Sequence, residues 1–143
     1  MQTNHVLKLN KVEEMLPFLP LLQELRPAIN ENRFYTMTKE LIDQGYCMMV
    51  LLANQEPVAL AGVVILTNYY DGKHVYVYDL VTSLYYRSKG YGEELLCSVE
   101  SWGKQRGCEN IVLSTGIQRR DAHRFYQEKG KYMKASYVFR KPL

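Results

Sequence analysis

Features that mark several other classes of protein are scarce in this chain of 143 residues. It has three cysteines, Cys47, Cys97 and Cys108, without a Cys-x-x-Cys pair, so we expect reduced thiols rather than a disulfide framework, zinc site or redox pair. Cys97 falls within a helical pattern, and we expect it to be a small packing residue. No apolar run approaches the roughly 18 residues that cross a bilayer. The first residues lack the basic and apolar regions of an export signal. We therefore expect a cytoplasmic protein.

Internal repeats and Pro- or Gly-rich linkers are also lacking, so we expect a single domain over residues 1–143. The charge is unevenly distributed: residues 1–71 hold 5 Lys and Arg against 8 Asp and Glu, and residues 72–143 hold 13 against 7. The basic half suits an anionic partner such as a phosphorylated cofactor, and a solvated basic surface explains it equally well. Because no nucleic-acid-reading motif accompanies the charge, neither nucleic acid nor a membrane is expected as a partner.

Hydrophobic periodicity and turn residues predict the order of elements along the chain. The expected elements are helices at 16–25 and 31–44, strands at 46–53, 58–66 and 74–82, a helix at 92–106, a strand at 110–114, a helix at 121–129 and an extended strand at 132–141. This order predicts an α/β (α+β) domain with a mixed sheet in the middle, flanked by helices.

The segment that carries chemistry is Arg87-Ser88-Lys89-Gly90-Tyr91-Gly92, between the strongest strand and the strongest helix. Its glycines let the backbone approach a ligand, and the following helix contributes the positive end of its dipole. Arg87 and Lys89 add positive charge, which suits a pyrophosphate. Walker and dinucleotide loops are excluded, because neither spacing fits Gly90-Tyr-Gly92. Two glycines that merely shape a turn are the alternative.

Three ordered motifs together resemble the GNAT family of N-acetyltransferases. They are Arg-x-x-Gly-x-Gly after a strand that ends Asp79-Leu80-Val81-Thr82, then Ala122-His123-Arg124-Phe125-Tyr126, then Gly130. The resemblance covers about 45–141 and implies a GNAT-type sheet in which the parallel strands 74–82 and 110–114 splay apart around coenzyme A. It implies acetyl-coenzyme A (acetyl-CoA) as co-substrate, no metal, and a small-molecule or peptide amine as acceptor. Because dimers are frequent in the family, a homodimer is a further expectation.

The resemblance also implies which residues bind the cofactor. The backbone of Leu80, Val81 and Thr82 would pair with the pantetheine arm like an added strand. The pyrophosphate would lie on Arg87, Ser88, Lys89, Gly90, Tyr91 and Gly92. Arg119 stands where many members carry an asparagine on the pantetheine, and an arginine there would instead reach a phosphate. Lys131 stands where an aromatic residue commonly follows the glycine.

Tyr126 corresponds to the family's tyrosine beside the thioester sulfur, which makes it both a cofactor contact and the candidate general acid. A departing thiolate has a pKa near ~8.5 and tyrosine one of about 10, so a tyrosine is protonated at pH 7 and can donate. Helical geometry alone favours a core aromatic beside Phe125 for Tyr126, and the resemblance favours the functional role.

The general base is less well defined. Many members carry a glutamate at the positions of Tyr76 or Tyr78, and Asp79 is the only acid in this strand. Strand alternation places Asp79 on the opposite face from Tyr78 unless a bulge intervenes. Asp79 as base, Asp79 as a structural residue, and a water relayed from a tyrosine hydroxyl or from His74 all remain open. The unmatched glutamate also keeps a second hypothesis, a non-catalytic acyl-CoA sensor of the same fold.

Overall fold

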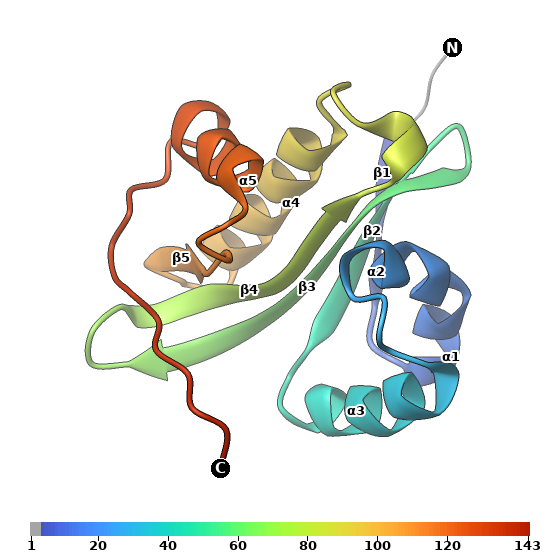
Figure 1. Ribbon diagram of the computed structural model, residues 1–143, viewed down its shortest axis with the longest axis horizontal. Helices are drawn as coiled ribbons and strands as arrows, with labels where there is room; N and C mark the ends of the chain where they lie inside the picture. The colour runs from blue at the N-terminus through green and yellow to red at the C-terminus, as the bar shows by residue number, and fades with distance from the viewer. Residues whose placement is uncertain (1–3) are drawn as a thin grey trace. The chain divides into compact units, whose positions relative to one another are not determined.

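A computed structural model describes residues 4–143 (Figure 1). The chain divides into two compact units, one that ends at Val112 and a second of Leu113–Leu143. The main feature is a five-stranded sheet with the spatial order β1-β2-β3-β4-β5. Its strands are β1 (Asn4–Leu9), β2 (Cys47–Ala53), β3 (Glu56–Asn68), β4 (Gly72–Thr82) and β5 (Asn110–Leu113). That residues 1–143 form a single domain stays a prediction.

The sheet is mixed, as the sequence predicts. The pairs β1–β2, β2–β3 and β3–β4 are antiparallel. β5 lies beside β4 and forms the one parallel pair of the described sheet, after a crossover through helix α4 (Tyr91–Gln105). A parallel neighbour needs such a crossover, because a tight turn can only reverse the chain.

Three helices precede β2: α1 (Val12–Met15), α2 (Leu19–Leu25) and α3 (Glu31–Asp43). Asn30 caps α3 by accepting a hydrogen bond from the Arg33 amide at 2.8 Å, which satisfies one of the free N–H groups at the helix start. One apolar cluster joins these helices to the first four strands. Its buried members are Leu9, Val12, Met15, Leu19, Leu21, Leu22, Phe34, Tyr46, Met48, Val50, Leu60 and Val81.

Helix α4 packs on the sheet through a close approach at Gly103. A Cβ built at Gly103 would lie 2.4 Å from Cγ2 of Val75 on β4. Leu95, Leu96, Val99 and Trp102 form the buried side of the same helix. Val75 therefore faces α4, whereas Val81 of the same strand belongs to the cluster under α1–α3.

A β-bulge in β4 explains why Val75 and Val81, six residues apart, face opposite sides of the sheet. Asp79 pairs with Gly62 and Val77 pairs with Val63, so Tyr78 has no partner of its own in the β3–β4 register. The extra residue shifts the alternation, and two consecutive residues then point to the same side of the sheet. Tyr78 and Asp79 accordingly both lie next to Tyr46, with ring centroids of the two tyrosines 6.3 Å apart.

The structure corrects four expectations. β1 was not predicted, because this edge strand is short and buries only Leu9 well. The helix expected at 16–25 begins earlier and is broken into α1, a 3₁₀ turn at Leu16–Phe18 and α2, since Pro17 and Pro20 cannot donate helical hydrogen bonds. Cys97 was expected to pack in the core and is exposed. The residues 132–141 were expected to form a strand, and none is described there.

The second unit contains α5 (Arg120–Arg124), which continues into a π-helical turn at Phe125–Lys129. This matches the helix predicted at 121–129. The amide of Gly130 closes the turn on the Phe125 carbonyl at 3.1 Å. In a π-helical turn each backbone hydrogen bond spans one more residue than in an α-helix. The directions of the side chains therefore change within a few residues.

Gly103→Ala tests the packing of α4 on β4. The added methyl group would lie 2.4 Å from Cγ2 of Val75. For so close an overlap we expect an overpacking cost of about 2–3 kcal/mol, against a gain of about 1 kcal/mol in helix propensity. We expect the free energy of unfolding, measured by urea denaturation, to fall by about 1–2 kcal/mol. Ser101→Ala, at an exposed position of the same helix, is the matched control. An unchanged value for Gly103→Ala would contradict the packing.

Candidate functional site

The turn after β4 is anchored at its start. The Ser83 amide still donates to the Val58 carbonyl of β3 at 2.8 Å. The next amide, of Leu84, donates to a carboxylate oxygen of Glu24 on α2 at 2.8 Å. A 3₁₀ turn at Leu84–Tyr86 follows, and Nε of Arg87 donates back to the Thr82 carbonyl at 3.2 Å. These bonds fix the path of the loop that leads into α4.

The loop then makes two left-handed turns before the helix. Ser88 has φ 63° and Gly90 has φ 84°, and α4 begins at Tyr91. No atom lies within 4 Å of a Cβ built at Gly90, so the space over this backbone is open. The first hydrogen bond of the helix runs from the Glu94 amide to the Gly90 carbonyl. The preceding amides of the first turn therefore have no intrahelical acceptor and can bind an anion.

Charged side chains surround this turn on the exposed surface. Arg87 and Lys89 are exposed, and the Lys89 ammonium lies 5.8 Å from the Tyr86 ring centroid. Glu93 and Glu94 stand in the first helical turn. The carboxylate of Glu94 accepts hydrogen bonds from the Asn4 amide group at 3.1 and 3.2 Å, so it is held by β1. The structure thus brings the predicted segment 87–92 into one compact turn with its cations outward.

The predicted pantetheine strand lies at the end of β4. Leu80, Val81 and Thr82 pair with β3 on one side only. On the other side β5 begins near the start of β4, where the Glu109 amide donates to the Lys73 carbonyl at 2.7 Å. Four residues of β5 cover about 13 Å, whereas the eleven of β4 extend over about 36 Å. Among the described residues, β5 is therefore too short to pair with Leu80, Val81 and Thr82. The edge of these three residues that faces away from β3 is left for an added strand.

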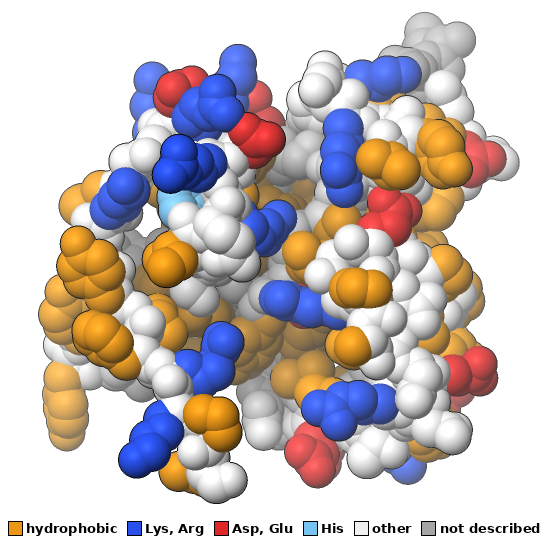
Figure 2. Space-filling view, viewed as in Figure 1, with side chains coloured by type: hydrophobic (Ala, Val, Ile, Leu, Met, Phe, Trp, Pro, Cys, Tyr) orange, Lys and Arg blue, Asp and Glu red, His pale blue; other side chains and the backbone are white. Residues whose placement is uncertain are grey.

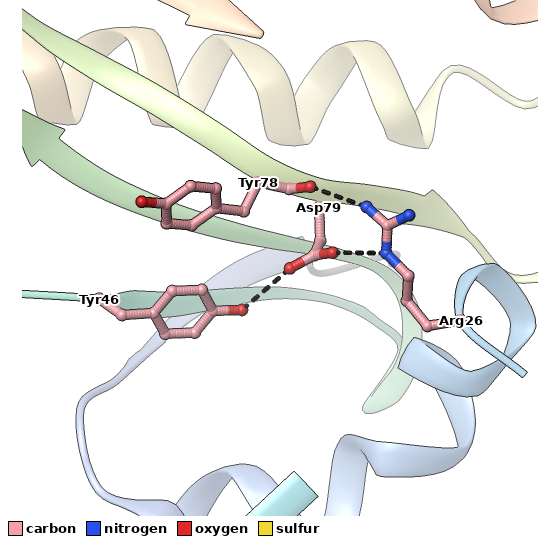
Figure 3. A network of polar contacts seen from close by, with 4 residues as sticks. All are labelled: Arg26, Tyr46, Tyr78 and Asp79. Carbon is pink, nitrogen blue, oxygen red and sulfur yellow. Dashed lines mark hydrogen bonds and ion pairs between the residues drawn. The ribbon is translucent and has the colours of Figure 1, made fainter. Parts of the chain in front are cut away.

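Asp79 is the centre of a polar network (Figure 3). Its carboxylate forms an ion pair with Nε of Arg26 at 3.0 Å and accepts a hydrogen bond from the Tyr46 hydroxyl at 3.4 Å. A second guanidinium nitrogen of Arg26 donates to the Tyr78 carbonyl at 3.0 Å. Burial, followed by the Asp79 charge, raises the pKa of Tyr46 well above its ordinary value of 10.0. Tyr46 is therefore a proton donor to this carboxylate at any physiological pH.

Sequence reasoning missed Arg26 and Tyr46 as parts of this site. Both are far from Asp79 along the chain, and the contact depends on the bulge, which has no clear signature in the residues of β4. One signal was available in hindsight. Gly62 stands in the middle of an apolar strand, and glycine there often marks a bulge or a close approach.

His74 does not suit the relay that the sequence left open. It is buried near the start of β4, where its Nδ1 lies 2.8 Å from the Gly72 carbonyl oxygen. Leu80 is six residues further along the strand, or about 20 Å away. A single water cannot span that distance. Tyr76 and Tyr78 are nearer, and their rings lie 5.2 Å apart.

Tyr126 lies in the second unit, on the π-helical turn. Its ring contacts Phe125 at 5.3 Å and Tyr132 at 5.8 Å between centroids. Burial raises the pKa of Tyr126 above 10.0, and the charge of Arg119 lowers it by less. The hydroxyl is therefore protonated at neutral pH, as a general acid must be. Nε2 of His123 lies 2.8 Å from the Gly116 carbonyl oxygen, so the imidazole is engaged with the backbone of its own unit.

Cys47 and Cys97 show no sign of nucleophilic activation. Burial raises the pKa of Cys47, and partial burial with the charges of Glu100 and Glu93 raises that of Cys97. A reactive thiol needs the opposite shift. Among residues 4–143 no group of three or more His, Cys, Asp or Glu is placed to hold a metal ion. No helix in that range is long and apolar enough to cross a bilayer.

Two open hollows on the described surface lie beside β1 and α4, and Trp102 lines both. None of the residues predicted to bind the cofactor lines either of them. The candidate site is therefore defined by the open edge of β4 and the turn before α4, and not by a closed pocket.

Comparison with known proteins gives the same family as the motifs. The family model described as "Acetyltransferase (GNAT) family" matches residues 13–130. An N-acetyltransferase of Bacillus subtilis (strain 168), YhdJ, is 34% identical over 140 residues, which cover 97% of this chain and 99% of the relative. An aminoalkylphosphonate N-acetyltransferase of Salmonella typhimurium is 40% identical over 67 residues, or 47% of this chain and 43% of that protein.

Among solved structures, the aminoglycoside N-acetyltransferase AAC(6')-Iy in complex with CoA has the same fold. It superposes with a TM-score of 0.84 at 16% identity, over 99% of this chain and 96% of that one. The match of the family model over most of the chain and the full-length relative decide the assignment: this protein belongs to the GNAT family of acetyltransferases.

Proposed function

We propose that this protein transfers an acetyl group from acetyl-CoA to a primary amine by direct attack of the amine on the thioester. The observation that carries the proposal is the open end of β4 followed by the left-handed turn at Gly90 and the start of α4. An extended arm pairs with a strand edge, and a pyrophosphate suits a helix start with cations around it.

In the proposed donor site, Leu80, Val81 and Thr82 bind the pantetheine through their backbone. The turn Arg87–Gly92 binds the pyrophosphate, and Arg119 adds a further contact to a phosphate. The open space over Gly90 supports this assignment, because a phosphate oxygen must approach the backbone closely. The exposed positions of Arg87 and Lys89 leave both side chains able to reach an anion.

In the proposed reaction the amine nitrogen attacks the thioester carbonyl carbon, and the carbon–sulfur bond breaks. Tyr126 donates its proton to the departing thiolate. Asp79, directly or through a water, takes the proton that the amine loses. An alkylamine with a pKa near 10.4 is less than about a thousandth neutral at pH 7, so a base or a desolvating site must help it lose its proton. The bulge supports Asp79 in this role, since it turns the carboxylate to the same side as Tyr78.

The acceptor that we propose is a small amine, although a peptide amine suits the same chemistry. One relative is named as an aminoalkylphosphonate N-acetyltransferase, and one protein of the same fold is named as an aminoglycoside N-acetyltransferase. Both names denote small amines as acceptors. Because the chain is similar to the first of these over less than half of either sequence, this support is for the class and not for one compound.

Turnover is tested by mixing the protein with acetyl-CoA and a panel of polyamines, amino acids, aminoalkylphosphonates, aminoglycosides and peptides. We expect thiol release with at least one amine, measured with a thiol reagent, and binding of CoA by calorimetry. CoA binding without turnover on any amine would favour the acyl-CoA sensor. The absence of both would remove the proposed function.

Tyr126→Phe separates the catalyst from the sensor. Loss of a general acid costs about 10²–10⁴-fold in rate, so we expect kcat to fall in that range while the affinity for CoA is kept. Because the pKa of Tyr126 is raised, the wild type should keep its acid form up to pH values above 10. Tyr69→Phe, at an exposed position in the turn between β3 and β4, is the control. Equal kcat for wild type and Tyr126→Phe would mean that another group protonates the thiolate.

We also propose that the protein is a homodimer, with the segment 132–141 in the interface. The sequence predicts a strand there, yet the side chains of Met133, Tyr137 and Phe139 are more than four-fifths exposed. Figure 2 shows apolar side chains, with basic ones between them, where this segment runs. A second copy of the chain can cover them by strand addition, in which backbone bonds give affinity.

Light scattering tests the dimer. We expect the mass of two chains for the wild type and of one chain for the double variant Val138→Asp, Phe139→Asp, because two charges in a covered strand are costly to desolvate. Tyr69→Asp changes an equally exposed aromatic residue in the turn between β3 and β4 and should stay dimeric. A monomeric wild type at tens of micromolar would rule the proposal out.

A further inference from the structure

Two oxygen atoms from β4 bind the Arg26 guanidinium together. One is Oδ1 of Asp79, at 3.0 Å from Nε, and the other is the Tyr78 carbonyl oxygen, at 3.0 Å from the second nitrogen. The bulge makes the carbonyl available, because Tyr78 has no partner in the β3–β4 register. A carboxylate and a carbonyl oxygen on one side form a receptor for a cation with at least two N–H donors.

The carboxylate in this receptor is held in place by a buried group. Tyr46 is 4% exposed, and its ring stacks on Tyr78 at an interplanar angle of 14°. To reach Asp79 from the start of β2, Tyr46 passes over Gly62 of β3, where a Cβ would lie 2.0 Å from the hydroxyl oxygen. The Tyr46 hydroxyl and the bulge thus fix Asp79 whether or not Arg26 is present.

The arginine, by contrast, is held loosely. Arg26 is the residue after the last turn of α2, with φ −124° and ψ 71°, outside helical geometry. Its side chain is 46% exposed, against 14% for Asp79. An ion pair with one partner in solvent contributes little free energy, so its cation can exchange. Water also reaches the same place, which gives a competing cation a path to the carboxylate.

We propose that the Asp79 carboxylate and the Tyr78 carbonyl form the binding site for the cationic amine of the acceptor, and that Arg26 occupies this site until the acceptor displaces it. The ligand class is an alkylammonium or guanidinium ion. The ring of Tyr78, which is 37% exposed, adds an aromatic face of the kind that attracts such cations. This inference rests on the proposed function, since it gives the acceptor a place next to the proposed base.

Arg26 is then an internal competitor and a positioning residue. A site that is partly occupied by its own arginine has an apparent affinity lowered by the fraction of free sites. Removal of the guanidinium should therefore tighten the binding of external cations. A purely structural ion pair would behave in the opposite way, because its removal leaves a carboxylate that is 14% exposed without its cationic partner and gives no gain in binding.

The first experiment measures binding without turnover. The probe is methylguanidinium at millimolar concentration, titrated into ¹⁵N-labelled protein and followed through the backbone amide signals of Gly62 and Asp79. We expect Arg26→Ala to bind it roughly two- to fivefold more tightly than the wild type, the range for displacement of a part-exposed ion pair. Arg26→Ala combined with Asp79→Asn should show no saturable shift. Equal shifts in the two variants would overturn the proposal.

The second experiment measures KM for the best amine of the panel. Arg26→Ala and Arg26→Gln should lower KM by a similar roughly two- to fivefold factor, whereas Arg26→Lys, which keeps a cation, should stay near the wild type. Arg33→Ala on α3 is the control for loss of a surface arginine. A KM that is unchanged or raised in Arg26→Ala would contradict the exchange.

The outcomes of these two experiments distinguish an error in the proposed exchange from an error in the proposed function. If no amine is acetylated, the methylguanidinium titration still reports whether the cation site exists. If amines are acetylated and the titration shows no difference between wild type and Arg26→Ala, the enzyme stands and the exchange is wrong. Urea unfolding of each variant shows whether a lost signal comes from a lost fold.

Discussion

The bulge at Tyr78 is the constraint on which the rest of the structure depends. Without it, Val75 and Val81 would face the same side of the sheet, because they are six residues apart in a strand of period two. With it, Val75 packs against α4 and Val81 joins the cluster under the N-terminal helices. The same extra residue turns Asp79 toward Tyr46 and frees the Tyr78 carbonyl. One backbone irregularity thus divides β4 between two apolar layers and creates its polar site.

The Asp79 carboxylate is mostly buried and therefore needs polar partners, which are Arg26 and Tyr46. The contact with Tyr46 requires a glycine in the neighbouring strand. Removing one partner of a buried pair typically destabilises a protein by about 3–5 kcal/mol, with less expected where one partner is exposed as Arg26 is. Tyr46 can serve Asp79 only because Gly62 has no side chain, and glycine weakens a strand interior. The strand therefore gives up side-chain packing at Gly62, where the Tyr46 hydroxyl passes on its way to Asp79.

The sequence was sufficient where local patterns decide the structure. The apolar runs of β2 to β4, the helix that ends at Gly45 and the loop from Arg87 into α4 were predicted within a few residues, because period and turn chemistry are local. It was insufficient where distant contacts decide. β1 forms because it pairs with β2, and the bulge in β4 is defined by its register with β3. The contact of Arg26 with Asp79 depends on where α2 packs. The segment after Gly130 has the composition of a strand, but strand formation also requires a neighbour to pair with.

The two ends of the candidate site present different charged groups, and in the proposed function these would order the two substrates. Arg87 and Lys89 lie at the start of α4 beside Glu93 and Glu94. The Asp79 carboxylate, paired with Arg26, lies about 10 Å back along β4 from Thr82, whose carbonyl accepts a hydrogen bond from Arg87. That separation is about one Debye length at physiological salt, so each charge acts mainly on the ligand next to it. In the proposed function a phosphorylated donor would be attracted to the loop, whereas a cationic acceptor would be attracted to the carboxylate. The amine and the thioester would then meet beside Leu80, which lies between Asp79 and the loop that starts after Thr82.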